Sequence, residues 1–324
     1  MLLNSSKFFF LSFMIVGIMI SLSCNSWIMI WSGMELFLLS FIPFFCNYSF
    51  VSSESSMSYF LVQSLSSSLF VFCMIYMLMY DFFLMKSFLV FSLLLKLGCA
   101  PIHSWIMGVV TGMDYYSLYI FFSFAKLPPF FLLSYISYNF SFFVMMSLFF
   151  GSVGGLNHSS MKKLLGFSSV FNMGFLLYLV GLSSLWIVYF LFYCLMLFFL
   201  IIFLGLYSFL YLNQLFLMGV GILSKVSFWV LFLSLGGIPP LMGFFVKLIA
   251  IELSILNCDY LISSFFIFSS LVVIFYYVRC SMVSMIMGSM IIKWNFSVFY
   301  FWLNLYSFMS FFFFPFYFLV SGLF

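Results

Sequence analysis

Charge is what this sequence lacks most, since ten Lys and Arg residues and six Asp and Glu residues are spread over 324 positions. Charged side chains make up 5% of the chain and hydrophobic ones 67%, with a mean hydropathy of +1.33. Such a chain cannot cover a soluble globule of this size with polar groups, so we expect a polytopic membrane protein. The net charge of +4 is small and scattered, which excludes a basic stripe that could follow the phosphates of a nucleic acid.

The sequence motifs of redox and nucleotide chemistry are also absent. There is no glycine-rich dinucleotide fingerprint, no phosphate-binding loop and no Cys or His cluster with the spacing of an iron–sulfur or haem site. The seven cysteines are odd in number and include no CxxC pair, so we interpret them as buried apolar residues and not as metal ligands or disulfides. We therefore expect no cofactor, no metal and no redox site in this chain.

Hydrophobic runs long enough to cross the roughly 30 Å of bilayer hydrocarbon fill the chain. We predict one all-α, antiporter-like transmembrane domain over residues 1–324, with about eleven helices. The predicted spans are 8–23, 26–48, 57–80, 83–110, 116–138, 141–157, 163–181, 184–210, 219–250, 260–285 and 298–322.

The loop cations predict how these spans are oriented. With eleven spans, the termini face opposite sides, and the cations outside the membrane fall mainly on the N-terminal side. Those on that side are Lys7, Lys162, Lys163, Lys225, Arg279 and Lys293, against Lys86 on the other. By the positive-inside rule, the N-terminus then faces the side of synthesis.

Two of the predicted spans are expected to be broken by proline. Pro101, in SLLLKLGCAPIHSW, and Pro239, in LGGIPPLMG, each remove a backbone donor and obstruct the preceding turn. Lipid cannot satisfy the freed carbonyls, so broken helices occur where they face protein or water. The breaks lie five spans apart, and an odd offset turns the second copy over in the membrane. We therefore predict two inverted repeats with paired broken helices near Pro101 and Pro239.

One acid and three bases lie at membrane depth, in four different predicted helices: Glu35, Lys96, Lys126 and Lys247. A charge in hydrocarbon is costly, so together they predict a protein-lined path for protons. We expect Glu35 and Lys96 to be the closest pair, with Lys126 between Lys96 and Lys247. The alternative for each lysine is that it snorkels to the interface, and for Glu35 that it only stabilises a neighbouring helix.

Polar neighbours of these four residues are candidates for holding water along such a path. His103 follows the first break, where it either relays protons or caps freed carbonyls. The hydroxyl groups that we expect to help hold water belong to Ser64, Ser66, Ser67, Ser68 and Ser123.

In this order along the chain, the polar residues and breaks resemble the NADH dehydrogenase subunit 2 family of the membrane arm of respiratory complex I. The resemblance runs from about residue 25 to residue 255. It rests on Trp31-Ser-Gly-Met-Glu35, Tyr59-Phe-Leu-Val-Gln63, Leu95-Lys96-Leu-Gly-Cys-Ala-Pro101-Ile-His103, Ala125-Lys126-Leu127, and Leu235-Gly-Gly-Ile-Pro239 through Lys247.

The resemblance implies a subunit that translocates protons while NADH oxidation and ubiquinone reduction occur in partner subunits, which hold FMN and the iron–sulfur clusters. By that match, Glu35 is the acid, Lys96 the lysine beside it, Lys126 the central connecting lysine and Lys247 the lysine of the second broken helix. The implied partners are other membrane-arm subunits, including neighbouring antiporter-like chains, and lipid such as cardiolipin.

The implied location is the mitochondrial inner membrane, with the N-terminus in the matrix and the C-terminus in the intermembrane space. A stand-alone cation/proton antiporter is the alternative function, because the fold of this family is similar to such transporters. An assembly subunit that has kept the fold but transports nothing is a third.

Overall fold

The computed structural model of the chain describes residues 5–47, 49–79, 83–136, 138–217, 222–239 and 241–286. The predicted span 298–322 lies outside these residues, as do Pro240 and Lys293. Within them the chain is helical, with no strand and one isolated β-bridge between Ser160 and Tyr211. Two compact units, Met1–Phe140 and Ser141–Phe324, are here called the N-terminal unit and the C-terminal unit.

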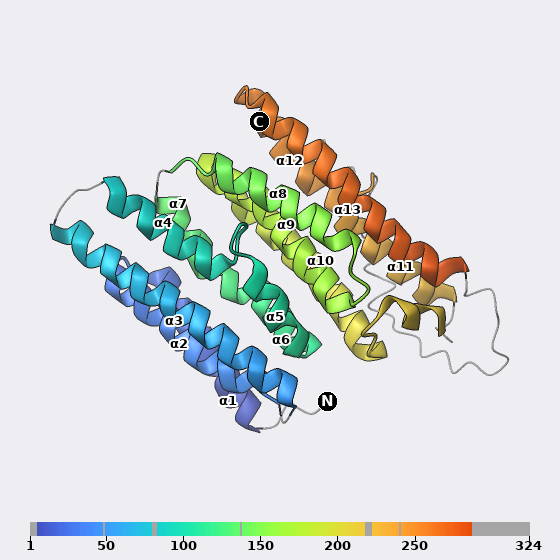
Figure 1. The fold of residues 1–324 in the computed structure, drawn as a ribbon, viewed down its shortest axis with the longest axis horizontal. Coiled ribbons are helices and arrows are strands. Elements are labelled where there is room, and N and C mark those ends of the chain that lie inside the picture. The colour runs from blue at the N-terminus through green and yellow to red at the C-terminus, as the bar shows by residue number, and fades with distance from the viewer. Residues whose placement is uncertain are drawn as a thin grey trace. The chain divides into compact units, whose positions relative to one another are not determined.

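The N-terminal unit is a set of helices that lie alongside one another (Figure 1). Its elements are α1 (Ser5–Ser23), α2 (Trp27–Phe45), α3 (Phe50–Met79), α4 (Phe83–Leu97), α5 (Ser104–Gly112), α6 (Tyr115–Phe122), the 3₁₀ segment η1 (Phe124–Lys126) and α7 (Leu127–Tyr135). The long α3 packs against both α4 and α5, so it bridges the first break, and α1 packs against α2 and α7.

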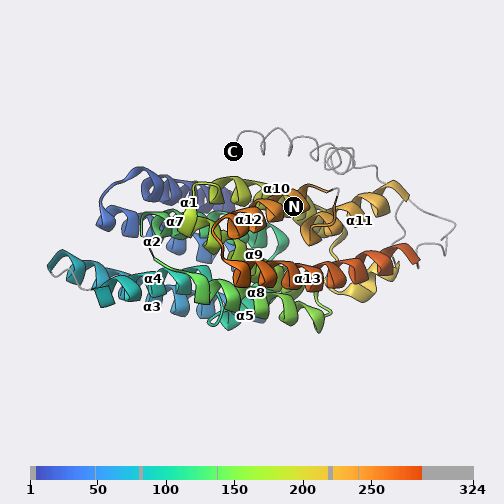
Figure 2. The ribbon, with the colours of Figure 1, turned by 90° about the horizontal axis from the view of Figure 1, so that it is seen from above.

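The C-terminal unit has a similar construction. Its elements are α8 (Ser141–Leu156), α9 (Met161–Leu182), α10 (Trp186–Tyr207), the 3₁₀ segment η2 (Leu212–Leu217), α11 (Ile222–Gly236), α12 (Met242–Leu256) and α13 (Tyr260–Ile286). Helix α13 lies beside α8 (Figure 2) and also packs against both α11 and α12.

Both predicted breaks are present. The first separates α4 from α5 over residues 98–103, and the second separates α11 from α12 over residues 237–241. In each, the first half-helix ends at a glycine with positive φ, Gly98 at +67° and Gly237 at +84°, a conformation that glycine adopts without steric cost. The breaks therefore begin with a turn that the sequence specifies by glycine as well as by proline.

The hydrogen bonds of the two breaks follow the same pattern, apart from one further bond in the second break, from the Gly237 N–H to the Leu233 carbonyl. The N–H of each glycine bonds to the carbonyl three residues earlier, and the next N–H reaches back five residues, which is a Schellman cap. The bonded pairs are Gly98 with Leu95 and Cys99 with Leu94 in the first break, and Gly237 with Ser234 and Ile238 with Leu233 in the second. The same local structure thus closes α4 and α11.

The two units also share an order of packing. In the described part of each unit, five long helical segments follow one another, and the fourth is broken in both units, as α4–α5 in one and α11–α12 in the other. In both units the first segment packs against the second and the fifth, and the third packs against the fourth. This correspondence supports an internal repeat, and the inverted orientation of its two copies stays a prediction.

Helix α3 begins seven residues before its predicted start at residue 57, at Phe50. Its first turns are rich in serine, which we did not assign to the helix. These hydroxyl groups donate to helix carbonyls three residues earlier, for example Ser53 to Phe50 at 2.7 Å and Ser55 to Ser52 at 2.9 Å. Serine is tolerated here because its polar group finds an acceptor on its own helix.

The predicted span 116–138 is interrupted, unlike the continuous helix that we expected. Helix α6 ends at Phe122, and the 3₁₀ segment η1 carries Lys126 before α7 begins. Pro128 and Pro129 remove two N–H groups that would otherwise close the α-helical turns around Lys126. The chain is therefore broken at a third place, beside a lysine.

By length and composition, seven helices of the described part are long and apolar enough to cross a membrane. The halves of the broken spans are too short to qualify alone, with 15 and 9 residues in α4 and α5 and 15 each in α11 and α12. Each of the ten predicted spans that fall in the described ranges is nevertheless helical over most of its length. The number of membrane crossings stays a prediction.

The cysteines are free, as we predicted, but they are not all buried. Cys73, Cys99 and Cys280 are buried, and Cys24 and Cys194 are partly so. Our interpretation is wrong for Cys46 and Cys258, which are exposed because they lie just beyond the ends of α2 and α12, outside the packed faces of these helices.

Candidate functional site

Glu35 and Lys96 form a buried ion pair in the N-terminal unit. Glu35 lies on α2 and Lys96 in the last turn of α4, and the distance from Glu35 Oε1 to Lys96 Nζ is 3.9 Å. The Lys96 side chain is 5% exposed and that of Glu35 22%. Each charge lowers the cost of burying the other, so the pair is stable where either residue alone would not be. The predicted pairing of the two residues is confirmed.

The carbonyl end of α4 is held by α3. Because α4 ends at Leu97, the carbonyl of Lys96 has no helical donor, and such a group must find a partner elsewhere. Gln63, on α3, supplies it by donating Nε2–H to the Lys96 carbonyl oxygen at 3.2 Å. Gln63 therefore fixes the turn from which the Lys96 ammonium projects.

Lys126 is buried to 3% exposure on the 3₁₀ segment η1. Its Nζ lies 4.9 Å from the centre of the Phe122 ring, a distance at which the face of the ring attracts a cation. The local break made by Pro128 and Pro129 turns this lysine inward, since a 3₁₀ turn places successive side chains differently from an α-helical one.

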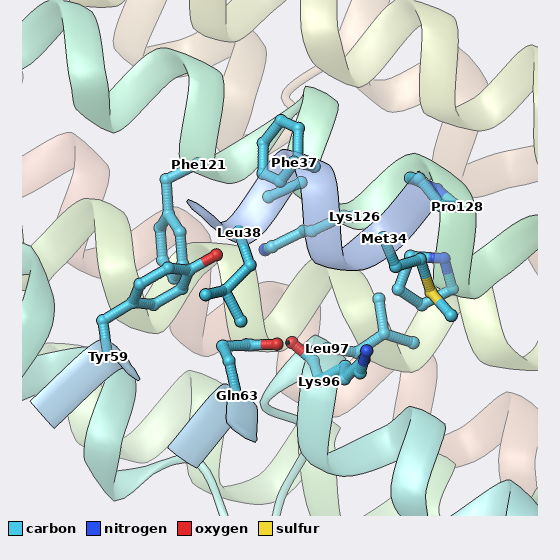
Figure 3. A pocket seen from close by; sticks show the side chains of 12 residues that line it. Met34, Phe37, Leu38, Tyr59, Gln63, Lys96, Leu97, Phe121, Lys126 and Pro128 are labelled. Carbon is cyan, nitrogen blue, oxygen red and sulfur yellow. Dashed lines mark hydrogen bonds between the residues drawn. The ribbon is translucent and has the colours of Figure 1, made fainter. Parts of the chain in front are cut away.

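A small cavity of about 30 Å³ adjoins both Lys96 and Lys126 (Figure 3). Its lining side chains come from α2, α3, α4, α6, η1 and α7 of the N-terminal unit. They are Met34, Phe37, Leu38, Tyr59, Gln63, Lys96, Leu97, Phe121, Ala125, Lys126, Pro128 and Pro129. Because a water molecule needs roughly 10–15 Å³ of such space and two or more polar partners, the cavity has the size and the lining for water.

The serines that we expected to hold water do not line this cavity. Their hydroxyl groups donate to carbonyls of their own helices, as Ser66 does to Gln63 at 2.7 Å and Ser123 to Tyr119 at 2.6 Å, and Ser64, Ser67 and Ser68 do likewise. The polar wall is formed instead by Tyr59 and Gln63. Their spacing of four residues, which places both on one face of a helix, was a signal in the sequence that we did not use.

Lys247 is buried in the C-terminal unit with a different kind of partner. Its Nζ donates to the carbonyl oxygens of Leu235 at 3.1 Å and Gly236 at 2.5 Å, the last carbonyls of α11. It also lies 5.1 Å from the centre of the Phe171 ring. Among the described residues it forms no ion pair, so the negative end of the α11 dipole takes the place that a carboxylate has beside Lys96.

Two further polar residues, His103 and Lys225, lie near the breaks. His103 is the N-cap residue of α5 and makes no side-chain bond to the N–H groups of that helix, but its imidazole forms a hydrogen bond with the backbone of Pro101 in the first break. Whether it relays protons or only caps this carbonyl stays a prediction. Lys225 was counted among the cations outside the membrane, although it falls in the predicted span 219–250; it lies in the first turn of α11 and is 9% exposed. The position of Lys126 between Lys96 and Lys247 stays a prediction.

In the described part of the chain, no group of three or more His, Cys, Asp or Glu side chains is placed to hold a metal ion. What the geometry does provide is a partly buried acid, buried amines and a water-sized cavity lined by two of those amines. Such groups can accept, hold and release protons, and the arrangement suits proton transfer through the protein.

Comparison with solved structures gives the fold. The chain is similar to a chain of respiratory complex I from Thermus thermophilus, with a TM-score of 0.81 at 18% identity over 95% of this chain and 76% of that one. It is also similar to a chain of the Mrp complex from Dietzia sp., with a TM-score of 0.75 at 17% identity over 84% and 59% of the two chains. At these identities the likeness concerns the fold alone.

Comparison of sequences gives the family. Residues 79–273 match the family described as NADH:quinone oxidoreductase/Mrp antiporter, TM. NADH-ubiquinone oxidoreductase chain 2 of Anopheles gambiae is 35% identical over 84% of each chain, and that of Artemia franciscana is 33% identical over 72% of this chain and 76% of the relative. The chain therefore belongs to the NADH-ubiquinone oxidoreductase chain 2 family.

Proposed function

We propose that this chain is a proton-translocating membrane subunit of respiratory complex I. The observation that carries the proposal is the buried Glu35–Lys96 pair beside a water-sized cavity that reaches Lys126. Membership of the chain 2 family adds the biological setting. Glu35, Lys96, Lys126 and Lys247 would carry the protons, with residues 1–324 acting as one antiporter-like domain.

The ion pair allows the charge on Glu35 to control how strongly Lys96 holds its proton. While Glu35 is charged, it stabilises the ammonium of Lys96 in a medium of low dielectric constant. Once Glu35 is protonated or moves away, the ammonium loses its partner, and transfer of its proton toward Lys126 becomes favourable. His103, at the end of the first break, would serve as a further relay.

Lys247 would act in the second broken helix. Carbonyl dipoles at the end of α11 stabilise its charged form by less than a full carboxylate does. A proton arriving from Lys126 could therefore be held there and passed on without a fixed counter-ion retaining it.

The redox chemistry is assigned to other subunits. NADH oxidation and ubiquinone reduction, with FMN and iron–sulfur clusters, would take place in partner chains, and this chain would hold no redox site or cofactor. Its partners would be other membrane-arm subunits, including neighbouring antiporter-like chains, and lipids such as cardiolipin. The location would be the mitochondrial inner membrane, with the N-terminus in the matrix and the C-terminus in the intermembrane space.

A stand-alone antiporter is the less favoured alternative, because its support is a fold likeness at 17% identity, whereas relatives above 30% identity are complex I subunits by name. Substitution of Lys126 by Met in the intact complex tests the proposal. We expect NADH-driven proton translocation in proteoliposomes to fall severely, because the central amine is removed. Normal translocation by an assembled Lys126→Met complex would contradict the proposed relay.

A further inference from the structure

Two side chains of α3, Tyr59 and Gln63, form the polar wall of the cavity between Lys96 and Lys126 (Figure 3). They are four residues apart, so they project from the same face of the helix. Tyr59 is 2% exposed and Gln63 7%. A buried hydroxyl and a buried amide on the wall of one small cavity are costly unless they have hydrogen-bond partners. Their placement therefore indicates a polar partner in the cavity.

The ring of Tyr59 is held on several sides by aromatic neighbours. Ring centres lie 5.4 Å away for Phe41, 6.1 Å for Phe45, 5.9 Å for Phe121 and 6.3 Å for Trp105. This packing fixes the direction of the ring and leaves the hydroxyl as its one polar atom. In Figure 3 that hydroxyl points toward the end of the Lys126 side chain.

Gln63 is fixed by a different contact. Its Nε2–H bond to the Lys96 carbonyl oxygen, 3.2 Å long, ties the amide to the end of α4. One more N–H and the Oε1 acceptor of the amide are left for other partners. The cavity beside this amide is where such a partner would lie.

The hydrogen-bonding capacity of lysine explains why these two residues are needed. A protonated lysine has three donors and no acceptor, so a water between the Lys96 ammonium and the neutral Lys126 amine accepts from the first and donates one hydrogen to the second. Its other hydrogen then requires an acceptor, and a buried water needs two to four partners in all. The Tyr59 oxygen and Gln63 Oε1 are acceptors on the cavity wall that come from neither lysine.

We propose that Tyr59 and Gln63 are positioning residues that hold and orient the water through which a proton passes from Lys96 to Lys126. This inference rests on the proposed function. In the step, Lys96 Nζ gives one proton to the water while the water gives another proton to the neutral amine of Lys126. Lys96 ends as the amine, Lys126 as the ammonium, and the water is regenerated, so no oxidant or further reactant is needed.

Variants of the intact complex test the proposal. Tyr59→Phe removes only the hydroxyl, and Gln63→Met keeps the length of the side chain but removes its polar atoms. Matched controls on the same helix are Tyr76→Phe, at a ring that is 40% exposed, and Ser68→Ala, whose hydroxyl bonds only to Leu65 of its own helix.

We expect both cavity variants to translocate protons roughly two- to tenfold more slowly, the change that corresponds to losing one hydrogen bond in the transfer step. The slowing caused by replacing H₂O with D₂O should also increase, because proton transfer would become rate-limiting. A purely structural role would not move this isotope effect. Both controls should match the unmodified complex.

Cavity variants that translocate protons at the normal rate, in an experiment where Lys126→Met does not, would overturn this inference and leave the proposed function standing. A normal rate in Lys126→Met would instead overturn the proposed function. If the cavity variants fail to assemble, an experimental structure of the unmodified complex decides: water bonded to Tyr59 and Gln63 supports the proposal, and a dry cavity refutes it.

Discussion

Lys247, on α12, bonds to the carbonyl end of α11. Its ammonium donates to the carbonyl oxygen of Gly236 at 2.5 Å across the second break. Lys247 also donates to the carbonyl oxygen of Leu235 at 3.1 Å, and the corresponding carbonyl in the first break, that of Lys96, is bonded by Gln63. Breaks that begin with the same Schellman cap are thus completed by an amide in one unit and by an ammonium in the other. Lys247 therefore contributes both to the stability of the break and to the proposed proton path, and suitable substitutions can separate these two contributions.

Replacing Lys247 by Met should weaken the subunit, because the Leu235 and Gly236 carbonyls lose their side-chain donor. An unsatisfied buried acceptor costs about 1–3 kcal/mol, so we expect a lower temperature for thermal dissociation of the solubilised membrane arm. Lys247→Arg keeps the donors, and we expect it to recover most of the stability. It should still fail to translocate protons, since a guanidinium does not release its proton in proteins. Proton translocation by Lys247→Arg at the normal rate would contradict this assignment.

Gly237→Ala should be destabilising for two reasons. A residue with a Cβ at φ +84° incurs a left-handed penalty of about 1–2 kcal/mol, and the added methyl group would lie 2.9 Å from the Lys247 ammonium. We expect a lower thermal dissociation temperature together with slower proton translocation. Gly108→Ala is the control, because nothing lies within 4 Å of its new methyl group. Equal behaviour of the two variants would rule out this account of the turn.

The ion pair predicts a non-additive double-mutant cycle. Glu35→Gln leaves the Lys96 ammonium buried without its counter-ion, and Lys96→Met leaves the carboxylate in the same state. The double variant removes both charges, so its loss of stability should be smaller than the sum of the single losses, by about 0.5–3 kcal/mol. The thermal dissociation temperatures of the three variants measure this coupling. Strict additivity would show that the 3.9 Å contact contributes nothing to stability.

The predicted orientation can be tested with the two exposed cysteines, Cys46 after α2 and Cys258 after α12. If the N-terminus faces the matrix, the predicted spans place Cys46 on the matrix side and Cys258 on the opposite side. A membrane-impermeant thiol reagent added to mitoplasts should then label Cys258, and Cys46 only after the membrane is permeabilised. The reverse pattern would reject the topology.

Much of the fold follows from the sequence because the determinants are local. Hydrophobic runs of sufficient length must close their backbone hydrogen bonds as helices in a membrane, and Pro101 and Pro239 break those bonds whatever surrounds them. The same reasoning marked Lys96, Lys126 and Lys247 as costly residues that need polar surroundings. The serine-rich start of α3 was missed because helix formation there depends on hydroxyl groups finding carbonyls of the same helix, which hydropathy does not register.

Apart from the Glu35–Lys96 pair, the partners of these residues were decided by the tertiary structure. Sequence spacing placed Tyr59 and Gln63 on one face of a helix, but only the packing of α3 against α4 and α5 turned that face toward the cavity. The pairing of Lys96 with Glu35 was predicted, but nothing along the chain indicated that Lys247 would bond to the carbonyls of α11. Hydropathy and helix breaks depend on neighbours along the chain, whereas a hydrogen bond or an ion pair depends on which helix faces meet.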